Sequence, residues 1–241
     1  MSRESVSLFQ LFEPQSSTYT YLLGDLRSGE ALFIDPVLET VERDLTLLHE
    51  LGWQLKYILD THVHADHITG AASLRERTGA QTGISAAAQV TCADLDLIDG
   101  QVLPFGAEGV KVIATPGHTA SCLSYLVGPY LFTGDALLIR GTGRTDFQQG
   151  SASLLYRSVH EKLFVLPDET IVYPAHDYKG QTRSTIGLEK KFNPRLGGDR
   201  SQSDFVAIMD NLKLAQPQKI AVALPANLAC GKPVKTDAGA H

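Results

Sequence analysis

The stretch Thr61-His-Val-His-Ala-Asp-His67 places three histidines and one aspartate within six residues. A short apolar strand is predicted directly before it, over Lys56–Asp60, and a helix directly after it, over Ile68–Arg77, ending at Gly79. The motif is therefore expected in a strand-to-helix loop, where α/β proteins present catalytic and binding residues. A structural role hardly explains so many imidazoles in one loop, so the stretch indicates a metal site.

Three more candidate ligands follow predicted strands further along the chain. They are His118 in Thr115-Pro-Gly-His118, Asp135 in Phe132-Thr-Gly-Asp135 and His176 in Tyr173-Pro-Ala-His176, and the strands are predicted over Val110–Thr115, Cys122–Val127, Tyr130–Thr133 and Thr170–Tyr173. Side chains placed in this way can gather at one edge of the sheets. Gly117 and Gly134 would let the backbone approach the metal closely.

The residue types favour a borderline-to-hard metal ion. Imidazole and carboxylate suit zinc, iron or manganese, and the absence of a cysteine cluster argues against a thiolate site. Any one of these histidines alone would more often be a surface or hydrogen-bonded core residue, but together they point to one site. His49, His160 and His241 lie outside the pattern and receive no function.

The remaining patterns predict one α/β domain over residues 1–231. A β-hairpin is expected from Thr18–Asp25 and Ala31–Pro36, and an amphipathic helix over Leu38–Leu51, ended by Gly52. Residues 187–199 read as a loop and residues 232–241 as a disordered tail.

Composition narrows the class of partner. The 241 residues carry 27 acidic and 21 basic side chains, a formal charge of −6, with no basic run, so neither nucleic acid nor a membrane is expected as a partner. No signal pattern or long apolar run is found, and the default expectation is a cytoplasmic protein. Cys92, Cys122 and Cys230 are widely spaced and odd in number, and they are expected to be buried free thiols in a reducing compartment.

In their order along the chain, the T-H-x-H-x-D-H, G-H-T, T-G-D and P-A-H motifs resemble those of the metallo-β-lactamase superfamily. Longer stretches resemble its persulfide dioxygenase branch: Thr61 to Gly70, Phe132 to Gly150, Tyr173-Pro-Ala-His-Asp-Tyr178, Asn193-Pro-Arg195 and Pro225-Ala-Asn227. The resemblance implies an αββα sandwich of two mixed β-sheets packed face to face, with helices outside and the metal at one end. Fold alone does not settle the reaction.

The resemblance also implies an activity. In that branch a single ferrous ion oxidises glutathione persulfide with O₂ and water to sulfite and glutathione, and by resemblance the catalytic iron ligands here are His62, His118 and Asp135. Two imidazoles and one carboxylate on one face of Fe(II) leave positions open for substrate and O₂.

Further roles are carried over residue by residue. His64, Asp66, His67 and His176 would occupy the second metal position of dinuclear relatives, and beside a single iron they are expected to orient its ligands and hydrogen-bond bound water. Arg144 and Arg195 are expected to bind the glutathione carboxylates, with Tyr178 and Asn227 as weaker candidates for the same pocket. For each arginine the competing interpretation is a surface ion pair.

Two departures from the family limit what carries over. Thr142 stands where many relatives have a cysteine, so no role of that thiol is transferred. A fused rhodanese-like domain is absent from the sequence, and a separate sulfurtransferase is expected to supply the persulfide. A homodimer is expected by resemblance alone.

Two other functions stay open. A dinuclear hydrolase resembling glyoxalase II would also use a glutathione conjugate, and there Asp135 would bridge two metals while hydroxide attacks a thioester. A non-catalytic metal-binding or persulfide-sensing module would instead show reactive thiolates at the cysteines and no turnover.

Overall fold

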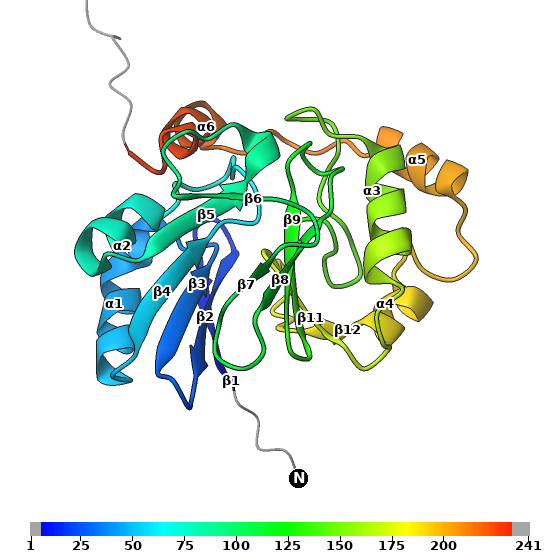
Figure 1. The fold of residues 1–241 in the computed structure, drawn as a ribbon. Coiled ribbons are helices and arrows are strands. Elements are labelled where there is room, and N and C mark those ends of the chain that lie inside the picture. Colours follow the sequence, from blue (N-terminus) through cyan, green and yellow to red (C-terminus); the bar gives the residue numbers. More distant parts are fainter. Residues whose placement is uncertain (1–5, 233–241) are drawn as a thin grey trace, which may run out of the picture.

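The computed structural model describes residues 6–232, in two six-stranded sheets with helices outside them (Figure 1). The strands are β1 Val6–Glu13, β2 Thr18–Asp25, β3 Glu30–Ile34, β4 Gln54–Leu59, β5 Gln81–Ser85, β6 Leu95–Leu97, β7 Val102–Leu103, β8 Val110–Ala114, β9 Leu123–Val127, β10 Tyr130–Gly134, β11 Ile171–Pro174 and β12 Ser184–Thr185. The α-helices are α1 Val41–Glu50, α2 Ala71–Thr78, α3 Ala152–Ser158, α4 Ile186–Phe192, α5 Gln202–Asp210 and α6 Ile220–Leu228, and the short helical turns are Leu38–Thr40, Ala86–Ala88 and Val159–Leu163.

Both sheets are mixed, as expected. The first has the strand order β1-β2-β3-β4-β5-β6, with antiparallel pairing from β1 to β3 and parallel pairing from β3 to β6. The second has the order β12-β11-β10-β9-β8-β7, in which only β10 and β11 run parallel. The β2–β3 hairpin is confirmed, and a further strand, β1, precedes it and pairs along the whole of β2.

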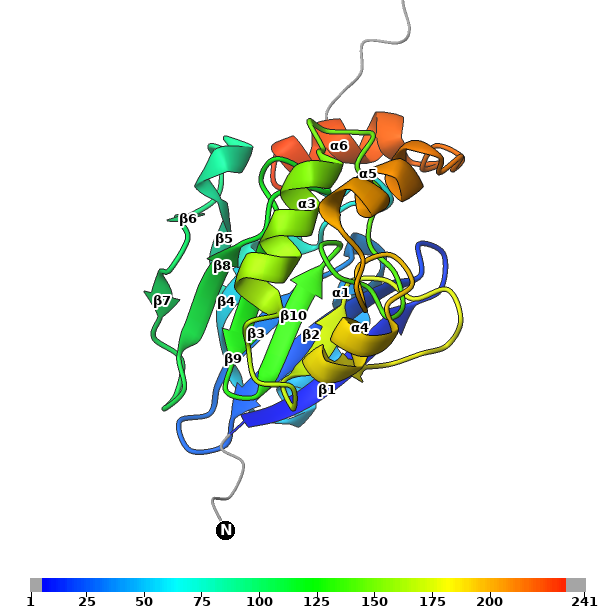
Figure 2. The same cartoon turned by 90° about the vertical axis from the view of Figure 1, so that its right-hand side faces the viewer.

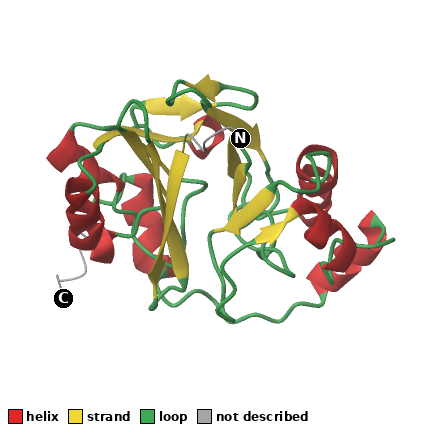
Figure 3. Cartoon of the chain, turned by 90° about the horizontal axis from the view of Figure 1, so that it is seen from below, coloured by secondary structure: helices red, strands yellow, loops and turns green. Residues whose placement is uncertain are grey.

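Three apolar layers make the sandwich. Side chains such as Leu32 and Tyr125 fill the space between the sheets. A second layer, including Phe33, lies under α1 and α2, and a third, including Leu155, lies under α3, α4 and α5. Burial of these layers is the main source of stability. Viewed from the side and from below, the helices flank the strands (Figures 2 and 3), so the αββα sandwich is confirmed.

The amphipathic helix is confirmed as α1, and Gly52 follows it at φ +65°. The second predicted helix begins three residues late, at Ala71, and ends where expected, because Gly79 adopts the left-handed conformation that terminates helices. The prediction of a loop over residues 187–199 is wrong for its first half, which belongs to α4. The Thr185 side chain caps that helix by accepting from the Leu188 N–H, and this signal was overlooked. Of the predicted tail, residues 233–241 lie outside the described residues.

The sheets are joined at one end by backbone hydrogen bonds between segments distant in sequence. The Tyr19 N–H donates to the Ala175 oxygen at 2.7 Å, and the Leu123 N–H donates to the Thr61 oxygen at 2.8 Å. The loops that follow β4, β8, β10 and β11 therefore meet at this end. Over residues 6–232, no helix has the length and apolar character needed to cross a bilayer.

The cysteine prediction needs one correction. Cys92 and Cys230 form a disulfide, with their Cα atoms 6.1 Å apart, although 138 residues separate them in sequence. Sequence spacing could not reveal this pair, because it forms only when the chain after α6 returns to the edge of the first sheet. Cys122 is a buried free thiol, as predicted, and burial raises its pKa to about 12.

Candidate metal centre

Three of the predicted ligands come together at the joined end of the sandwich. Donor atoms of His62, His118 and Asp135 all lie within 4.8 Å of one another. Each residue follows a different strand, β4, β8 and β10 respectively. The prediction that strand-terminal residues gather at one edge is therefore confirmed.

His62 is held by the residue before it. The Asp35 carboxylate accepts from the Thr61 N–H at 2.7 Å and from the Thr61 hydroxyl at 2.9 Å, and that hydroxyl lies 2.9 Å from His62 Nδ1. Burial, and then the neighbouring imidazoles of His64 and His118, hold the pKa of His62 well below its usual range. A neutral imidazole with one nitrogen occupied by a hydrogen bond presents its other nitrogen as a ligand.

His118 is oriented by a backbone carbonyl. Its Nδ1 lies 2.6 Å from the Arg144 oxygen, which can only accept, so Nδ1 carries the proton and Nε2 faces the centre. The loop can come this close because residue 143 is glycine: a Cβ there would lie 2.5 Å from the Asp135 oxygen and 2.9 Å from His118 Nδ1. Gly117 and Gly134 make room for Leu155 and Thr61, because a Cβ at either glycine would clash with these residues. Their expected close approach to a metal stays a prediction.

Asp135 has an oxygen that no protein group satisfies. Its Oδ2 lies 3.5 Å from His118 Nε2, whereas its buried Oδ1 has no hydrogen-bond partner and lies 3.7 Å from His176 Nε2. An unpaired buried carboxylate oxygen is costly. A metal ion bound by His62, His118 and Asp135 would satisfy it, so the residues fit the group that the motif indicates.

A second cluster adjoins the first. His64, Asp66 and His67 also offer donors within 4.8 Å of one another, and the buried nitrogens His64 Nδ1 and His67 Nε2 lack partners. His176 Nε2 lies 3.6 Å from Asp66 Oδ2, so His176 faces both clusters.

Charges within the second cluster are strongly coupled. Burial opposes protonation of His64, yet the Asp35 carboxylate, 3.0 Å from Nε2, raises its pKa to about 9. Burial alone would raise the pKa of Asp66, but the imidazoles of His176 and His67 hold it well below the usual range. These groups fit the expected role of orienting and hydrogen-bonding around the ligands.

A cavity of about 490 Å³ opens over the ligands. Its walls include three of the four predicted substrate residues, Arg144, Tyr178 and Arg195. Arg144 also matches the competing interpretation, because its guanidinium pairs with Asp146 at 2.6 Å and donates to the Ala215 oxygen at 2.6 Å. Asn227 does not line this cavity. It lies behind the loop of residues 61–69, and its amide oxygen and nitrogen both hydrogen-bond to the backbone of that loop.

Several functional residues were missed. Asp35 at the end of β3 holds both Thr61 and His64, and its Asp-Pro sequence after a strand was the available signal. Lys179 and Gln148 line the cavity, and Gln148 Nε2 donates to the Val63 oxygen at 2.7 Å. Buried Glu189 pairs with Arg140 of the cavity wall and was hidden within the predicted loop.

Known proteins share this fold and much of this sequence. The family model of the metallo-beta-lactamase superfamily matches residues 14–176. The persulfide dioxygenase ETHE1, mitochondrial, of Mus musculus is 52% identical over 94% of this chain and 89% of its own. The crystal structure of ETHE1 from Myxococcus xanthus has a TM-score of 0.91 and 52% identity, covering 94% of this chain and all of that one. A hydroxyacylglutathione hydrolase of Cereibacter sphaeroides is 36% identical over 75% of this chain and 71% of its own.

Fold and site together define a metalloenzyme of the metallo-beta-lactamase superfamily, to which the chain belongs. Within that superfamily it falls in the family of the persulfide dioxygenases, to which it is similar over nearly its whole length.

Proposed function

We propose that this protein is a persulfide dioxygenase that converts glutathione persulfide, O₂ and water to glutathione and sulfite. One observation carries the proposal: the His62, His118 and Asp135 donor set lies at the floor of a cavity in a chain 52% identical to the persulfide dioxygenases. The alternative of a non-catalytic sensor is weakened, because Cys92 and Cys230 are paired and burial keeps Cys122 a thiol.

One Fe(II) held by His62, His118 and Asp135 is the proposed cofactor. It would supply open coordination positions and one-electron redox chemistry with O₂, which amino-acid side chains lack, while the persulfide sulfur is the net source of electrons. The protein's part is to fix the ligands. Asp35 acts on His62 through Thr61, and the Arg144 oxygen acts on His118.

The cavity walls suit an anionic substrate. Among the described residues, neither Arg195 nor Lys179 forms an ion pair with a carboxylate, although both line the cavity. Arg195 Nη1 donates to the Thr142 oxygen at 2.9 Å and to the Thr142 hydroxyl at 3.2 Å, and its Nε and Nη2 form no hydrogen bond with the described residues. Two unpaired cations would bind the carboxylates of glutathione, while Arg144 holds the 214–215 segment at the cavity wall.

Oxygen consumption with glutathione persulfide tests this function. We expect O₂ uptake and sulfite release in the protein loaded anaerobically with Fe(II), with one iron bound per chain. The matched control is His49→Ala, which removes an exposed histidine of α1 and should leave iron content and rate unchanged. No O₂ uptake by protein with one iron per chain would refute the proposal.

A thioester hydrolase is the second candidate. The observation in its favour is the second donor cluster of His64, Asp66 and His67 beside the first, together with the similarity to a hydroxyacylglutathione hydrolase. Two metals per chain and cleavage of a glutathione thioester without O₂ uptake would support it over the dioxygenase.

We also propose that a separate sulfurtransferase supplies the persulfide. We propose further that the protein forms a homodimer, which light scattering can measure. A cytoplasmic location follows from composition, but the Cys92–Cys230 disulfide argues against it, because disulfides are uncommon in reducing compartments.

A further inference from the structure

Asn227 ties the metal loop, defined here as residues 61–69, to helix α6. Its side chain is buried and belongs to no wall of the metal cavity. Its Oδ1 accepts from the Thr69 N–H at 2.9 Å, and its Nδ2 donates to the oxygens of His64 and His67, both at 2.8 Å. One amide therefore satisfies three backbone groups of the loop that carries the histidine motif.

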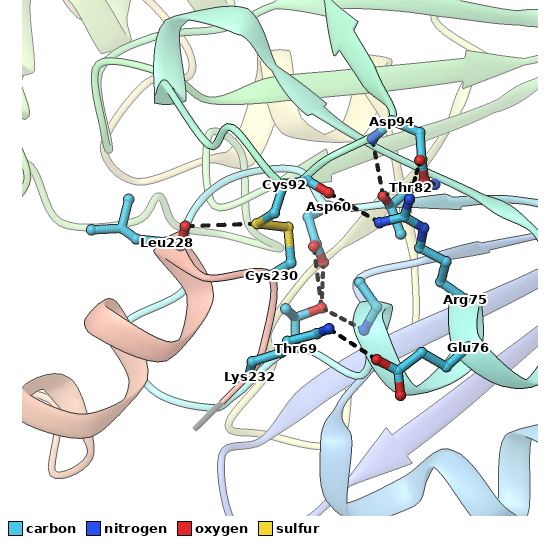
Figure 4. The surroundings of a disulfide bond; sticks show 11 residues. Asp60, Thr69, Arg75, Glu76, Thr82, Cys92, Asp94, Leu228, Cys230 and Lys232 are labelled. Carbon is cyan, nitrogen blue, oxygen red and sulfur yellow. Dashed lines mark hydrogen bonds and ion pairs between the residues drawn. A yellow bond between two sulfur atoms is a disulfide. The ribbon is translucent and has the colours of Figure 1, made fainter. Parts of the chain in front are cut away.

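Helix α6 is itself held against the loop by a disulfide. Cys230 lies three residues after Asn227 and bonds to Cys92, which lies before β6 of the first sheet (Figure 4). The next residue touches the loop directly, since a Cβ on Gly231 would lie 2.3 Å from the Thr69 oxygen. Thr69 in turn donates from its hydroxyl to Asp60 at 2.9 Å, as Figure 4 shows.

Besides Asn227, helix α6 buries only two small side chains, those of Ala223 and Ala226. Ion pairs of Lys219 with Glu39 and of Lys232 with Glu76 lie on the surface, where such pairs contribute little. Leu224 adds an apolar contact to the small cluster that includes Val63 and Cys230. The disulfide adds a covalent constraint on where Asn227 sits.

We propose that Asn227 is a positioning residue for the metal loop, and that the Cys92–Cys230 disulfide makes its hold on the loop sensitive to thiols. The inference rests on the metal site of the proposed function and not on the reaction catalysed there. Reduction frees the end of α6, loosens the three hydrogen bonds of Asn227 and lowers the affinity of the site for its metal.

The reductant is a low-molecular-weight thiol of the glutathione type. The disulfide borders a surface hollow of about 350 Å³, so such a thiol can reach it. One thiolate attacks a sulfur of the disulfide, forming a mixed disulfide and releasing the other cysteine as a thiolate; a second thiolate then displaces the remaining cysteine. The balance is two thiols oxidised to one external disulfide and one protein disulfide reduced to two thiols.

The first test compares oxidised and thiol-reduced full-length protein, with alkylation and mass spectrometry to count free thiols. Co(II) affinity is measured by competition with a chelator, and amide exchange is followed at Thr69. We expect reduction to weaken Co(II) binding about tenfold and to speed exchange at Thr69, because groups that orient ligands contribute about 10–100-fold to metal affinity. The Cys92→Ser/Cys230→Ser variant should have the Co(II) affinity and Thr69 exchange rate of the reduced protein, and added thiol should change neither.

The second test changes the amide itself. Asn227→Ala should weaken Co(II) binding about tenfold and shift the Co(II) absorption bands, which report ligand geometry. Asn227→Asp keeps the acceptor for Thr69 and loses both donors, so Thr69 should stay protected while Co(II) affinity falls. The matched control is Asn211→Ala, which removes an exposed amide at the end of α5 and should change none of these readouts.

Unchanged Co(II) affinity and Thr69 exchange on reduction would overturn the thiol-sensitive part. Unchanged affinity and spectrum in folded Asn227→Ala would overturn the positioning role. Because metal binding is read without turnover, a failure of the dioxygenase assay would leave both results interpretable.

Discussion

The two sheets contribute to the proposed metal centre in different ways. The first sheet supplies His62, His64, Asp66 and His67 from one loop after β4. The second supplies His118, Asp135 and His176 from three loops after three different strands. A contiguous loop can be positioned by a few anchors, such as Asp35 and Asn227, whereas dispersed ligands depend on the packing of the whole second sheet. The first contribution is therefore visible in sequence, and the second needs the fold.

Removing a ligand of the second sheet should have the largest effect. His118→Ala deletes one of three donors, so we expect metal binding to weaken by more than about 100-fold, beyond the loss from any orienting group, and activity to disappear. Metal analysis after dialysis checks this, with His49→Ala as control. Normal metal content in His118→Ala would show that His118 is not a ligand and would leave Asp135 as the second sheet's contribution to the proposed set.

Removing the anchor of the first sheet should act through stability as well. Asp35 is buried and holds Thr61 and His64, so Asp35→Asn in metal-free protein should cost about 3 kcal/mol, as when one partner of a buried ion pair is lost. The folded-state pKa of His64, raised to about 9 from 6.5, gives the pH dependence. The stabilisation of the folded state by the Asp35–His64 ion pair is complete below pH 6.5 and is lost as the pH rises through 9.

Urea unfolding at pH 6 and pH 10 measures that difference. The difference in free energy of unfolding between wild type and Asp35→Asn should be larger at pH 6 than at pH 10, because His64 is charged at pH 6 in both the folded and the unfolded protein. An equal gap at both pH values would show that the charge of His64 plays no part in anchoring the loop.

What could be predicted follows the same division. The histidine loop, the strands before each ligand and the αββα layers were predictable, because local patterns and a family resemblance specify them. The partners of Asp35, of the buried Glu189 and of Cys92 were not, because they lie far away in sequence and meet these residues only after folding. Asn227 was predicted to bind substrate, but its side chain binds the loop backbone instead. The motif indicates that the residue is important, and it carries no information on whether the side chain faces the cavity or α6.

Removing a cation from the cavity wall should have a smaller effect, confined to substrate binding. Arg195 has no carboxylate partner among the described residues, so Arg195→Ala should raise KM about 10- to 100-fold with kcat little changed, the range for a hydrogen bond to a charged group. Arg195→Lys should recover part of the loss, and Arg157→Ala, on the exposed face of α3, serves as control. A fall in kcat at constant KM would place Arg195 in support of the metal centre instead.

The smallest effect is expected at the remaining thiol of the second sheet. Cys122 begins the segment opposite the histidine loop, and burial raises its pKa from 9.0 to about 12. At pH 8 its thiolate is about a thousandfold scarcer than in the unfolded chain, since three pKa units separate the two states. Iodoacetamide should therefore label Cys122 only after unfolding, with mass spectrometry as the readout, and native activity should be unaffected by the reagent. Rapid labelling of the folded protein at Cys122 would revive the sensor hypothesis and would mean that the second sheet opens at the metal end far more readily than its packing indicates.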